Sequence, residues 1–421
     1  MIERCLWTET APDEPGWAAG PPPDRTDVAI VGGGYTGLAA ARALARRGVD
    51  TTVLERHTID WGASSRNGGF VLPGFKPDVA VLARKLGVAE ARRLFDLSRR
   101  ALEELGALVA DEAIDCDYTR CGSVALAARA AHMAGLERSH RFLRDQLGYE
   151  TTLLTRGELG GEIGSTHYYG GLLDPLAGAV QPARLVDGLA RATAGAGARL
   201  VERVEVRGLE RRRDGWLLAS SAGPVLAREV LVATNGYTGP AVPALRRRLV
   251  PVGSYLIATP PLDPALAARL VPRGRVLSDT KNLLYYFRLS PDGRMVFGGR
   301  AAFTPTPVAR SAQILARGMV EVFPELAGMA VEYAWGGQVA FTLDQMPHAG
   351  RLDGVHYALG YGGHGVALSV WLGARMGDAL AGAGEIPRLT ASFRPVPLYG
   401  GRPWFLPFAG GYYRVRDALG W

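Results

Sequence analysis

Apolar residues near the N-terminus form short runs that predict a strand, a helix and a second strand in quick succession. Residues 27–31 (DVAIV) form an apolar run of the kind found in buried parallel strands, and residues 51–54 (TTVL) form another. Between them, residues 38–47 are rich in alanine and leucine, which favours a helix. A glycine-rich turn, GGGYTG, joins the first strand to this helix. The pattern therefore predicts one βαβ unit.

Longer stretches of the chain have helical periodicity. Across residues 76–155 apolar side chains such as Leu94 and Leu97 recur at three- and four-residue spacing, with arginines on the opposite face. Residues 181–195 predict a further helix, with a proline in the first turn, where a helix tolerates it. Residues 308–322 predict another.

Strand-like runs dominate the remaining sequence. The first three are separated by the turn signals DG and AGP, so they predict a meander, and the later ones are interrupted by the helix at 308–322. A last strand and helix follow residue 355. In chain order the runs are ARLVERVEVRGL, GWLLASS, AREVLVATNG, VGSYLIAT, NLLYYFRLS, RMVFGG and EYAWGGQVAFTLD.

This order of elements predicts an α/β fold with a discontinuous Rossmann-like nucleotide-binding domain and an inserted domain with a mixed or antiparallel sheet. The Pro/Gly-rich N-terminus predicts an extended arm, and the aromatic C-terminus a tail. The expected boundaries are 1–25 for the arm; 26–75, 180–245 and 331–390 for the nucleotide-binding domain; 76–179 and 246–330 for the inserted domain; and 391–421 for the tail.

Composition narrows the class of protein. With 421 residues, of which 48% are hydrophobic and 21% charged, the chain is long enough for two interleaved domains. Its net charge of +7 comes from scattered basic residues, and the short runs at 211–213 and 246–248 are typical of solvated surface, so we expect no nucleic-acid partner. No apolar run is long enough for a membrane span or a signal peptide. Three cysteines without a CxxC pair predict neither zinc nor disulfides, as in a cytoplasmic protein.

The turn after the first strand matches the pattern G-x-G-x-x-G. Gly32 permits a tight turn, Gly34 lets a pyrophosphate approach the backbone, and Gly37 lets the helix pack against the strand. Glu55 ends the second strand, 23 residues after Gly32, where its carboxylate can accept hydrogen bonds from a ribose. These features predict a dinucleotide site but do not distinguish NAD from FAD.

Three further glycine-rich segments favour a flavin over a nicotinamide. The loop at 62–69 (GASSRNGG) follows the second strand where a nicotinamide dehydrogenase would continue into further βα units, and its small polar residues suit a flat ring and a ribityl chain. A turn at 234–236 (TNG) ends a meander strand. A second glycine-lined helix start at 360–366 suits the pyrimidine end of a reduced flavin, which is negatively charged.

Five segments together resemble the FAD-dependent D-amino acid oxidase superfamily, in the branch that holds glycine oxidase, sarcosine oxidase and γ-glutamylputrescine oxidase. They are DVAIVGGGYTGLAAARALARRG, GASSRNGGFV, VLVATNGYT, WGGQVAFTLDQMPHAG and GYGGHGVALS, within a likeness that spans about residues 5–390. The residues that the resemblance places around FAD are Gly32, Gly34, Tyr35, Thr36, Gly37, Glu55, Arg56, Gly62, Ala63, Ser64, Ser65, Arg66, Asn67, Gly68, Gly69, Val206, Thr234, Asn235, Gly236, Gly362, Gly363, His364, Gly365 and Val366. Arg66 is placed either against a phosphate or the flavin, or as a brace for its loop.

The resemblance implies an enzyme that removes hydride from a carbon bearing an amine nitrogen and passes it to FAD, without a metal. The expected partners are a small amine or amino-acid substrate and oxygen as electron acceptor. Another acceptor, or a flavoprotein without turnover, is the alternative. Members with covalent flavin attach it to a cysteine where this chain has none, so non-covalent FAD is expected. Of the three lysines in the chain, Lys76 and Lys281 are nearest to the position of the lysine that assists oxygen in sarcosine-oxidase-like members.

The candidate substrate residues come mainly from two strands. In NLLYYFRLS, Tyr286 and Arg288 share one face, and the resemblance implies that Arg288 binds a substrate carboxylate; pairing with an acid beneath the sheet is the alternative. Tyr255 is either a pocket wall or part of the core, and His364 either transfers a proton or contacts the flavin through its main chain. For the C-terminal tail, residues 391–421, three roles are expected as alternatives: covering the mouth of the site, forming a subunit contact, or packing against its own domain.

Overall fold

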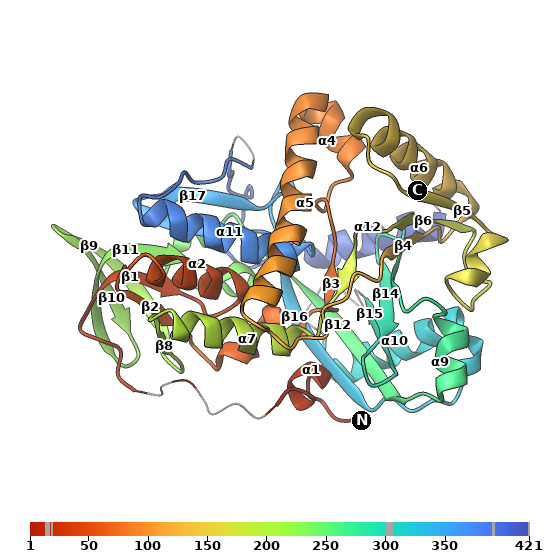
Figure 1. The fold of residues 1–421 in the computed structure, drawn as a ribbon, viewed down its shortest axis with the longest axis horizontal. Coiled ribbons are helices and arrows are strands. Elements are labelled where there is room, and N and C mark those ends of the chain that lie inside the picture. Colours follow the sequence, from red (N-terminus) through yellow and green to blue (C-terminus); the bar gives the residue numbers. More distant parts are fainter. Residues whose placement is uncertain (13–16, 18–19, 300–305, 390–391, 420–421) are drawn as a thin grey trace.

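The computed structural model describes residues 1–12, 17, 20–299, 306–389 and 392–419, and Figure 1 shows two β-sheets with helices packed around them. The first sheet has the order β17-β18-β11-β1-β2-β8, with β10 and β9 continuing from β11. Its central strands pair in parallel, as expected for a sheet covered by crossover helices. Its strands are β1 (Arg25–Val31), β2 (Thr51–Leu54), β8 (Arg199–Val201), β9 (Val206–Arg212), β10 (Gly215–Ser220), β11 (Gly223–Val232), β17 (His348–Leu352) and β18 (Val355–Leu359).

Helices from distant parts of the chain cover this sheet. They are α2 (Tyr35–Ala45), α7 (Pro182–Gly195) and α11 (Gly365–Leu380), and α5 (Val88–Asp111) packs against α11. A Cβ at Gly373 would lie 2.3 Å from the Thr36 carbonyl oxygen, and one at Gly377 would lie 2.5 Å from that of Ala40. These glycines therefore let α11 lie directly against α2, which brings two segments far apart in the sequence into one layer (Figure 1).

The second sheet has the order β16-β12-β15-β14-β13-β4-β6-β5 and is antiparallel except for the β13–β4 pair. Its apolar face packs on α10 (Val308–Val322) and α9 (Pro264–Leu270) around three phenylalanines, at positions 287, 297 and 323. Its strands are β4 (Ser123–Leu126), β5 (Thr152–Thr155), β6 (Gly170–Asp174), β12 (Val250–Pro261), β13 (Val276–Asp279), β14 (Tyr285–Leu289), β15 (Arg294–Gly299) and β16 (Tyr333–Phe341).

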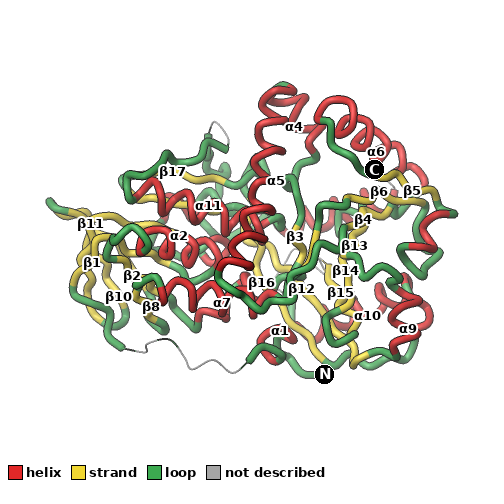
Figure 2. Tube along the Cα trace, viewed as in Figure 1, coloured by secondary structure: helices red, strands yellow, loops and turns green. Residues whose placement is uncertain are grey.

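Shorter elements connect the two sheets, as the tube view in Figure 2 shows. The strands β3 (Phe70–Val71) and β7 (Gly178–Ala179) pair with each other between the two sheets. The remaining helices are α1 (Leu6–Glu9), α3 (Ala63–Arg66), α4 (Val79–Leu86), α6 (Ala130–Phe142), α8 (Pro243–Arg246) and α12 (Leu406–Leu419), with short turns of helix η1 (Ile59–Trp61), η2 (Leu143–Leu147), η3 (Glu158–Gly161), η4 (Asn235–Tyr237) and η5 (Pro324–Leu326).

The fold class expected from the sequence is confirmed, whereas some element assignments change. The βαβ unit, the meander and the helices at 181–195 and 308–322 are present. The region 76–155 was expected to be helical, but it also contains β4 and β5, because both strands pair with β6 further along the chain. The domain boundaries stay a prediction. We note that β16, grouped above with the nucleotide-binding segments, pairs with β12 in the second sheet.

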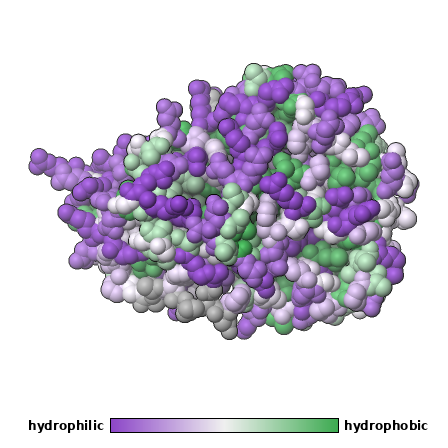
Figure 3. Space-filling model, in the orientation of Figure 1, coloured by the Kyte–Doolittle hydropathy of each residue, from purple (hydrophilic) through white to green (hydrophobic). Residues whose placement is uncertain are grey.

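The surface is mainly polar on the face shown in Figure 3, with apolar residues in scattered groups between charged ones. Among the residues that the structure describes, no helix is both long and apolar enough to cross a bilayer.

Candidate functional site

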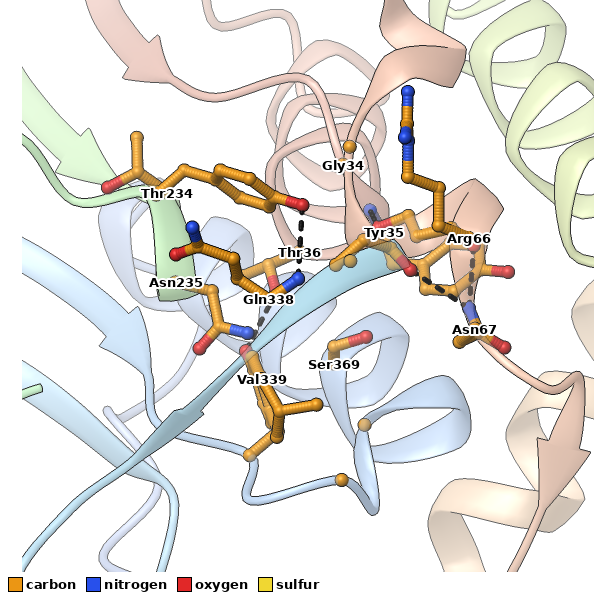
Figure 4. Close-up of a pocket in the computed structure, with 18 of the residues that line it drawn as sticks. Gly34, Tyr35, Thr36, Arg66, Asn67, Thr234, Asn235, Gln338, Val339 and Ser369 are labelled. Atoms are coloured by element: carbon orange, nitrogen blue, oxygen red, sulfur yellow. Dashed lines mark hydrogen bonds between the residues drawn. The ribbon is translucent and has the colours of Figure 1, made fainter. Parts of the chain in front are cut away.

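A cavity of about 730 Å³ runs between the two sheets, from the carboxyl ends of β1 and β11 to the face of β12 and β14. Its size is that of a typical ligand or cofactor site. In Figure 4, Thr234, Asn235 and Gln338 lie on one side of it, and Tyr35, Arg66 and Asn67 lie on the other. The carboxyl edge of a parallel sheet is where α/β folds ordinarily bind nucleotides.

The glycine turn at the start of α2 shapes one end of the cavity. Gly32 has φ +109°, and a Cβ at Gly37 would lie 2.0 Å from the Gly32 carbonyl oxygen. A Cβ at Gly34 would lie 2.7 Å from Ser64 Oγ, which accepts a hydrogen bond from Tyr35 N at 3.0 Å. The N-cap residue of α2 is Gly34, which has no side chain to cap the helix, so amides of its first turn other than Tyr35 N remain available to an anionic ligand.

Glu55 lies at the same end and is organised by the main chain. Its Oε2 accepts a hydrogen bond from Gly33 N at 2.8 Å, and its Oε1 accepts one from His57 N at 2.9 Å. A carboxylate oxygen has a second lone pair, so each can still accept a hydroxyl. Arg56 and Val206 line the cavity beside Glu55. The carboxylate is therefore held in position for the two hydroxyls of a ribose.

The loop at 62–69 forms the middle of the cavity wall. Residues 63–66 make the single turn of α3, and Asn67 closes it by donating from Nδ2 to the carbonyl oxygens of Ala63 (3.2 Å) and Ser64 (2.7 Å). Asn67 Oδ1 accepts a hydrogen bond from Gly69 N at 2.8 Å. The Asn67 amide thus shapes the loop from within, while the residue itself still lines the cavity.

Two indoles hold this loop from behind, and the sequence analysis missed both. Trp7 Nε1 donates to the Asn67 carbonyl oxygen at 2.8 Å, and Trp335 Nε1 donates to that of Arg66 at 3.0 Å. Cys5 Sγ lies 3.4 Å from the Ser65 carbonyl oxygen, and burial raises the pKa of this thiol to about 11, which keeps it a neutral donor. With these carbonyls occupied on the outer side, the loop presents its inner side to the cavity. Neither tryptophan lies near the loop in sequence, so no local signal could have found them.

Arg66 acts as a brace for the same loop. Its Nε donates to the Trp61 carbonyl oxygen at 2.6 Å and its Nη1 to that of Gly336 at 3.2 Å, while its guanidinium lies 5.0 Å from the centre of the Trp61 ring. These contacts match the bracing alternative, although the residue also borders the cavity.

The turn after β11 and the start of α11 meet at the far side of the cavity. Asn235 has φ +43°, and its Oδ1 accepts a hydrogen bond from Gly360 N at 2.9 Å, which joins the two segments. Gly362 and Gly363 also have positive φ, and His364 N-caps α11 without a side-chain hydrogen bond to the helix. The first turn of α11 therefore offers a second helix N-terminus to the cavity.

Most of the residues predicted for FAD line this one cavity. Four predicted residues do not: Gly37 packs on Gly32, Gly236 packs on Gln338, Ser65 is fully buried, and Gly69 lies against Val180. Their roles are in shaping the turns rather than in contact. The predicted residues that line the cavity are Gly32, Gly34, Tyr35, Thr36, Glu55, Arg56, Gly62, Ala63, Ser64, Arg66, Asn67, Gly68, Val206, Thr234, Asn235, Gly362, Gly363, His364, Gly365 and Val366.

Tyr286 lies at the other end of the cavity, which we call the substrate end. Its hydroxyl lies 2.9 Å from Ser254 Oγ, and its ring packs edge-on against Phe70. Tyr255 does not line the cavity. In β12 the neighbours Ser254 and Leu256 face the cavity, so the side chain of Tyr255 faces the core on the other side of the strand. The Tyr255 hydroxyl donates to the Thr306 carbonyl oxygen and accepts from Thr306 N.

Arg288 shares the face of Tyr286, as expected, but it does not reach the cavity. Its Nη1 donates to the carbonyl oxygens of Gly69 (3.1 Å) and Val180 (2.8 Å), and its guanidinium lies 5.3 Å from the centre of a Trp7 ring. Burial lowers the pKa of this guanidinium to about 10. The structure shows neither of the two expected roles of Arg288, a carboxylate clamp or a pair with an acid. Instead, Arg288 hydrogen-bonds to the main chain at the junction of the two sheets.

The remaining walls of the substrate end include Lys76, one of the two lysines named from the sequence, together with side chains that the sequence analysis did not assign to the site. Burial raises the pKa of Asp279 to about 6, and its Oδ2 pairs with Lys281 Nζ at 3.1 Å. Lys281 lies 3.5 Å from the centre of the Tyr285 ring, whereas Lys76 borders the cavity beside Gly362. The additional lining residues are Leu72, Phe75, Lys76, Asp78, Ala125, Ser254, Leu256, Ser278, Asp279, Thr280 and Leu284. Within the described part of the chain, no cluster of side chains could hold a metal ion.

Comparison with known proteins defines the class. Residues 27–379 match the family model described as FAD dependent oxidoreductase, so the chain belongs to that family. The glycine turn, Glu55 with its spare lone pairs and two uncapped helix starts fit FAD. The protein is an FAD-dependent amine or amino-acid oxidoreductase.

Two curated relatives are similar along nearly their whole length. Gamma-glutamylputrescine oxidoreductase of Escherichia coli (strain K12) is 34% identical over 399 residues, which are 94% of this chain and 93% of that protein. The probable oxidoreductase OrdL of Rhizobium meliloti (strain 1021) is 33% identical over 421 residues, which are 98% of this chain and 97% of that protein. Among solved structures, glycine oxidase from Geobacillus kaustophilus has the same fold, with a TM-score of 0.71, 24% identity and coverage of 90% of this chain and 99% of that one.

Proposed function

We propose that the enzyme oxidises the C–N bond of an amine that has no carboxylate on the same carbon. The observation that supports this is the position of Arg288, whose donors go to main-chain carbonyls and away from the substrate end. A neutral hydroxyl pair, Tyr286 with Ser254, lies there instead. The carboxylate of an α-amino acid would find no guanidinium from β14 at this end of the cavity. The relative that acts on gamma-glutamylputrescine agrees with an amine substrate.

In the proposed reaction the amine-bearing carbon loses a hydride and the nitrogen loses a proton, which leaves an imine that water hydrolyses. Bound FAD supplies the hydride acceptor. The chain orients the amine between Tyr286 and the 62–69 loop, and Phe70, Leu72 and Phe75 restrict water at this end. The groups that would hold FAD are main-chain amides and the Glu55 carboxylate, which supports non-covalent binding.

We propose oxygen as the electron acceptor, which would leave the enzyme as hydrogen peroxide after taking two electrons and two protons. A cationic side chain close to the cavity supports this step, and Lys76 is the lysine placed there. Lys76→Met should slow flavin reoxidation in air and leave anaerobic reduction by the amine unchanged. We also propose a cytoplasmic location, which the three free cysteines support.

A matched pair of compounds tests the substrate class. 1,4-Diaminobutane, its γ-glutamyl amide and butylamine should bleach the flavin without air, whereas norvaline, the α-carboxylated counterpart of butylamine, should not. The only amine-bearing carbon of norvaline also carries a carboxylate. Readmission of air should restore the flavin and form peroxide. Equal bleaching by norvaline and butylamine would contradict the amine assignment, and bleaching that air does not reverse would favour a dehydrogenase. A flavin that no amine bleaches would indicate a flavoprotein without turnover.

A further inference from the structure

The helix α12 packs against the outer side of the substrate end. Leu406 is 4% exposed and lies in an apolar cluster with Val252 of β12, Phe341 of β16 and the side chain of Leu283. Tyr413 belongs to the same cluster. The described part of the tail therefore packs on the second sheet of its own chain.

Asp417, in the last turn of α12, lies on the same helical face as Leu406 and Tyr413, at spacings of eleven and four residues. Its Oδ1 accepts hydrogen bonds from Asn282 N at 2.9 Å and from Asn282 Nδ2 at 2.8 Å, and its Oδ2 accepts one from Leu283 N at 2.9 Å. A carboxylate at the C-terminal end of a helix is disfavoured by the helix dipole. Three hydrogen bonds to a charged acceptor offset this cost.

The donors of these hydrogen bonds belong to the hairpin loop 280–284, which joins β13 to β14. Both ends of the loop border the cavity, through Thr280 on one side and Leu284 on the other. The middle of the loop, at residues 282 and 283, finds its hydrogen-bond acceptors on α12. The tail thus holds the outer side of a loop whose inner side is a wall of the substrate end.

The base of the same loop is held from inside the fold. Asp279 Oδ1 accepts hydrogen bonds from Lys281 N at 3.2 Å and Tyr285 N at 3.1 Å. Thr280 Oγ1 accepts one from Ala128 N at 3.1 Å and lies 2.6 Å from His132 Nδ1. With its base fixed in this way, the tip is the part of the loop whose position depends on α12.

We propose that Asp417 is a positioning residue that sets the width of the substrate end by holding the 280–284 loop from outside. This inference rests on the proposed function, since it concerns the binding of the amine. Loss of the carboxylate should release the tip, displace Leu284 beside it, and weaken binding of the amine. The FAD-binding residues lie at the other end of the cavity, so flavin content should be unchanged.

The test compares Asp417→Ala and Asp417→Asn with Asp214→Ala, a control that removes an exposed carboxylate from the β9–β10 turn. Because three hydrogen bonds to a charged acceptor are lost, we expect KM for the amine to rise about tenfold in Asp417→Ala, with kcat changing less than about twofold. Asp417→Asn keeps one acceptor oxygen and should show a smaller rise. Asp214→Ala should match the wild type.

Amide hydrogen exchange of peptides covering residues 280–284 provides a readout that does not depend on turnover. Exchange at Asn282 and Leu283 should become faster in Asp417→Ala and stay unchanged in the control. Unchanged exchange would overturn the anchor, and faster exchange with an unchanged KM would overturn its role in substrate binding. If no amine reduces the wild-type flavin, the proposed function is wrong, and the exchange rates alone then support or overturn the anchor.

Discussion

The two ends of the cavity are built from different parts of the polypeptide. At the end lined by the glycine turn and Glu55, which we call the nucleotide end, the walls are glycine turns that offer main-chain amides, and the segments 32–37, 55–56 and 62–68 lie close together in sequence. At the substrate end the walls are side chains from β12, β14 and the 280–284 loop. Main-chain groups are the same in every sequence that makes the turn, whereas a wall depends on each side chain. A shared cofactor is therefore compatible with divergent substrates in one family.

We expect the largest effect, a loss of FAD affinity, from a glycine substitution at the nucleotide end that removes no hydrogen-bonding or charged group. In Gly37→Ala the new Cβ would lie 2.0 Å from the Gly32 carbonyl oxygen, and that atom belongs to rigid backbone. Such overpacking costs about 1–3 kcal/mol, and here it moves the turn itself, so we expect FAD affinity to fall by about 100-fold or more. Flavin absorbance per protein after purification measures this. Gly195→Ala, in α7 with open space around the new methyl group, is the control and should retain its flavin.

Arg288 lies between the two ends of the cavity. Its replacement should lower the stability of the fold without weakening substrate binding, so the two effects can be measured separately. Arg288→Leu leaves the Val180 carbonyl oxygen without its donor and removes one of the two donors to the Gly69 carbonyl oxygen, which should lower the free energy of unfolding by about 3 kcal/mol. Chemical denaturation measures the loss. KM for the amine should change little in the folded fraction, and a large selective rise in KM would show that Arg288 contributes to substrate binding. Arg228→Leu removes an exposed arginine from β11 and should cost under about 1 kcal/mol.

A smaller effect is expected from the indole that supports the 62–69 loop. Trp335→Phe removes the donor to the Arg66 carbonyl oxygen, at a cost of about 1 kcal/mol, and should weaken FAD binding several-fold. Titration of the apoprotein with FAD measures the change. Trp216→Phe is the matched control, because this indole is also buried but its Nε1 has no acceptor among the described residues. An equal loss in both variants would mean that packing, and not the hydrogen bond, supports the loop.

At the substrate end, Asp279 should make stability depend on pH. Burial raises its pKa to about 6 in the folded protein, against about 3.9 in an unfolded chain. Between these values the folded state binds more protons, so this group's contribution to the free energy of unfolding falls as pH rises from about 4 to about 6. The melting temperature of Asp279→Asn relative to wild type should therefore rise by a few degrees between pH 4.5 and pH 7. A constant difference across that range would contradict the raised pKa.

The local parts of the site were predictable from sequence for a physical reason. Gly32, Gly34 and Glu55 act through one βα turn and the end of the next strand, and the spacing of the residues determines that geometry. Strand parity is also a local property, and it placed Tyr286 and Arg288 on one face, which the family resemblance assigned to the substrate. The same parity argument placed Arg288 on the correct face but could not say how far along that face the cavity extends.

The sequence by itself determined the glycine turns that line the cavity, the fold class and the family, because these depend on glycine positions and on the periodicity of short segments. Only the tertiary structure decided which side chains complete the site. Trp7 and Trp335 meet the 62–69 loop from opposite ends of the chain, and Asp417 reaches the 280–284 loop across more than 130 residues. Such contacts depend on how the two sheets and the tail pack together, and no short segment contains that information.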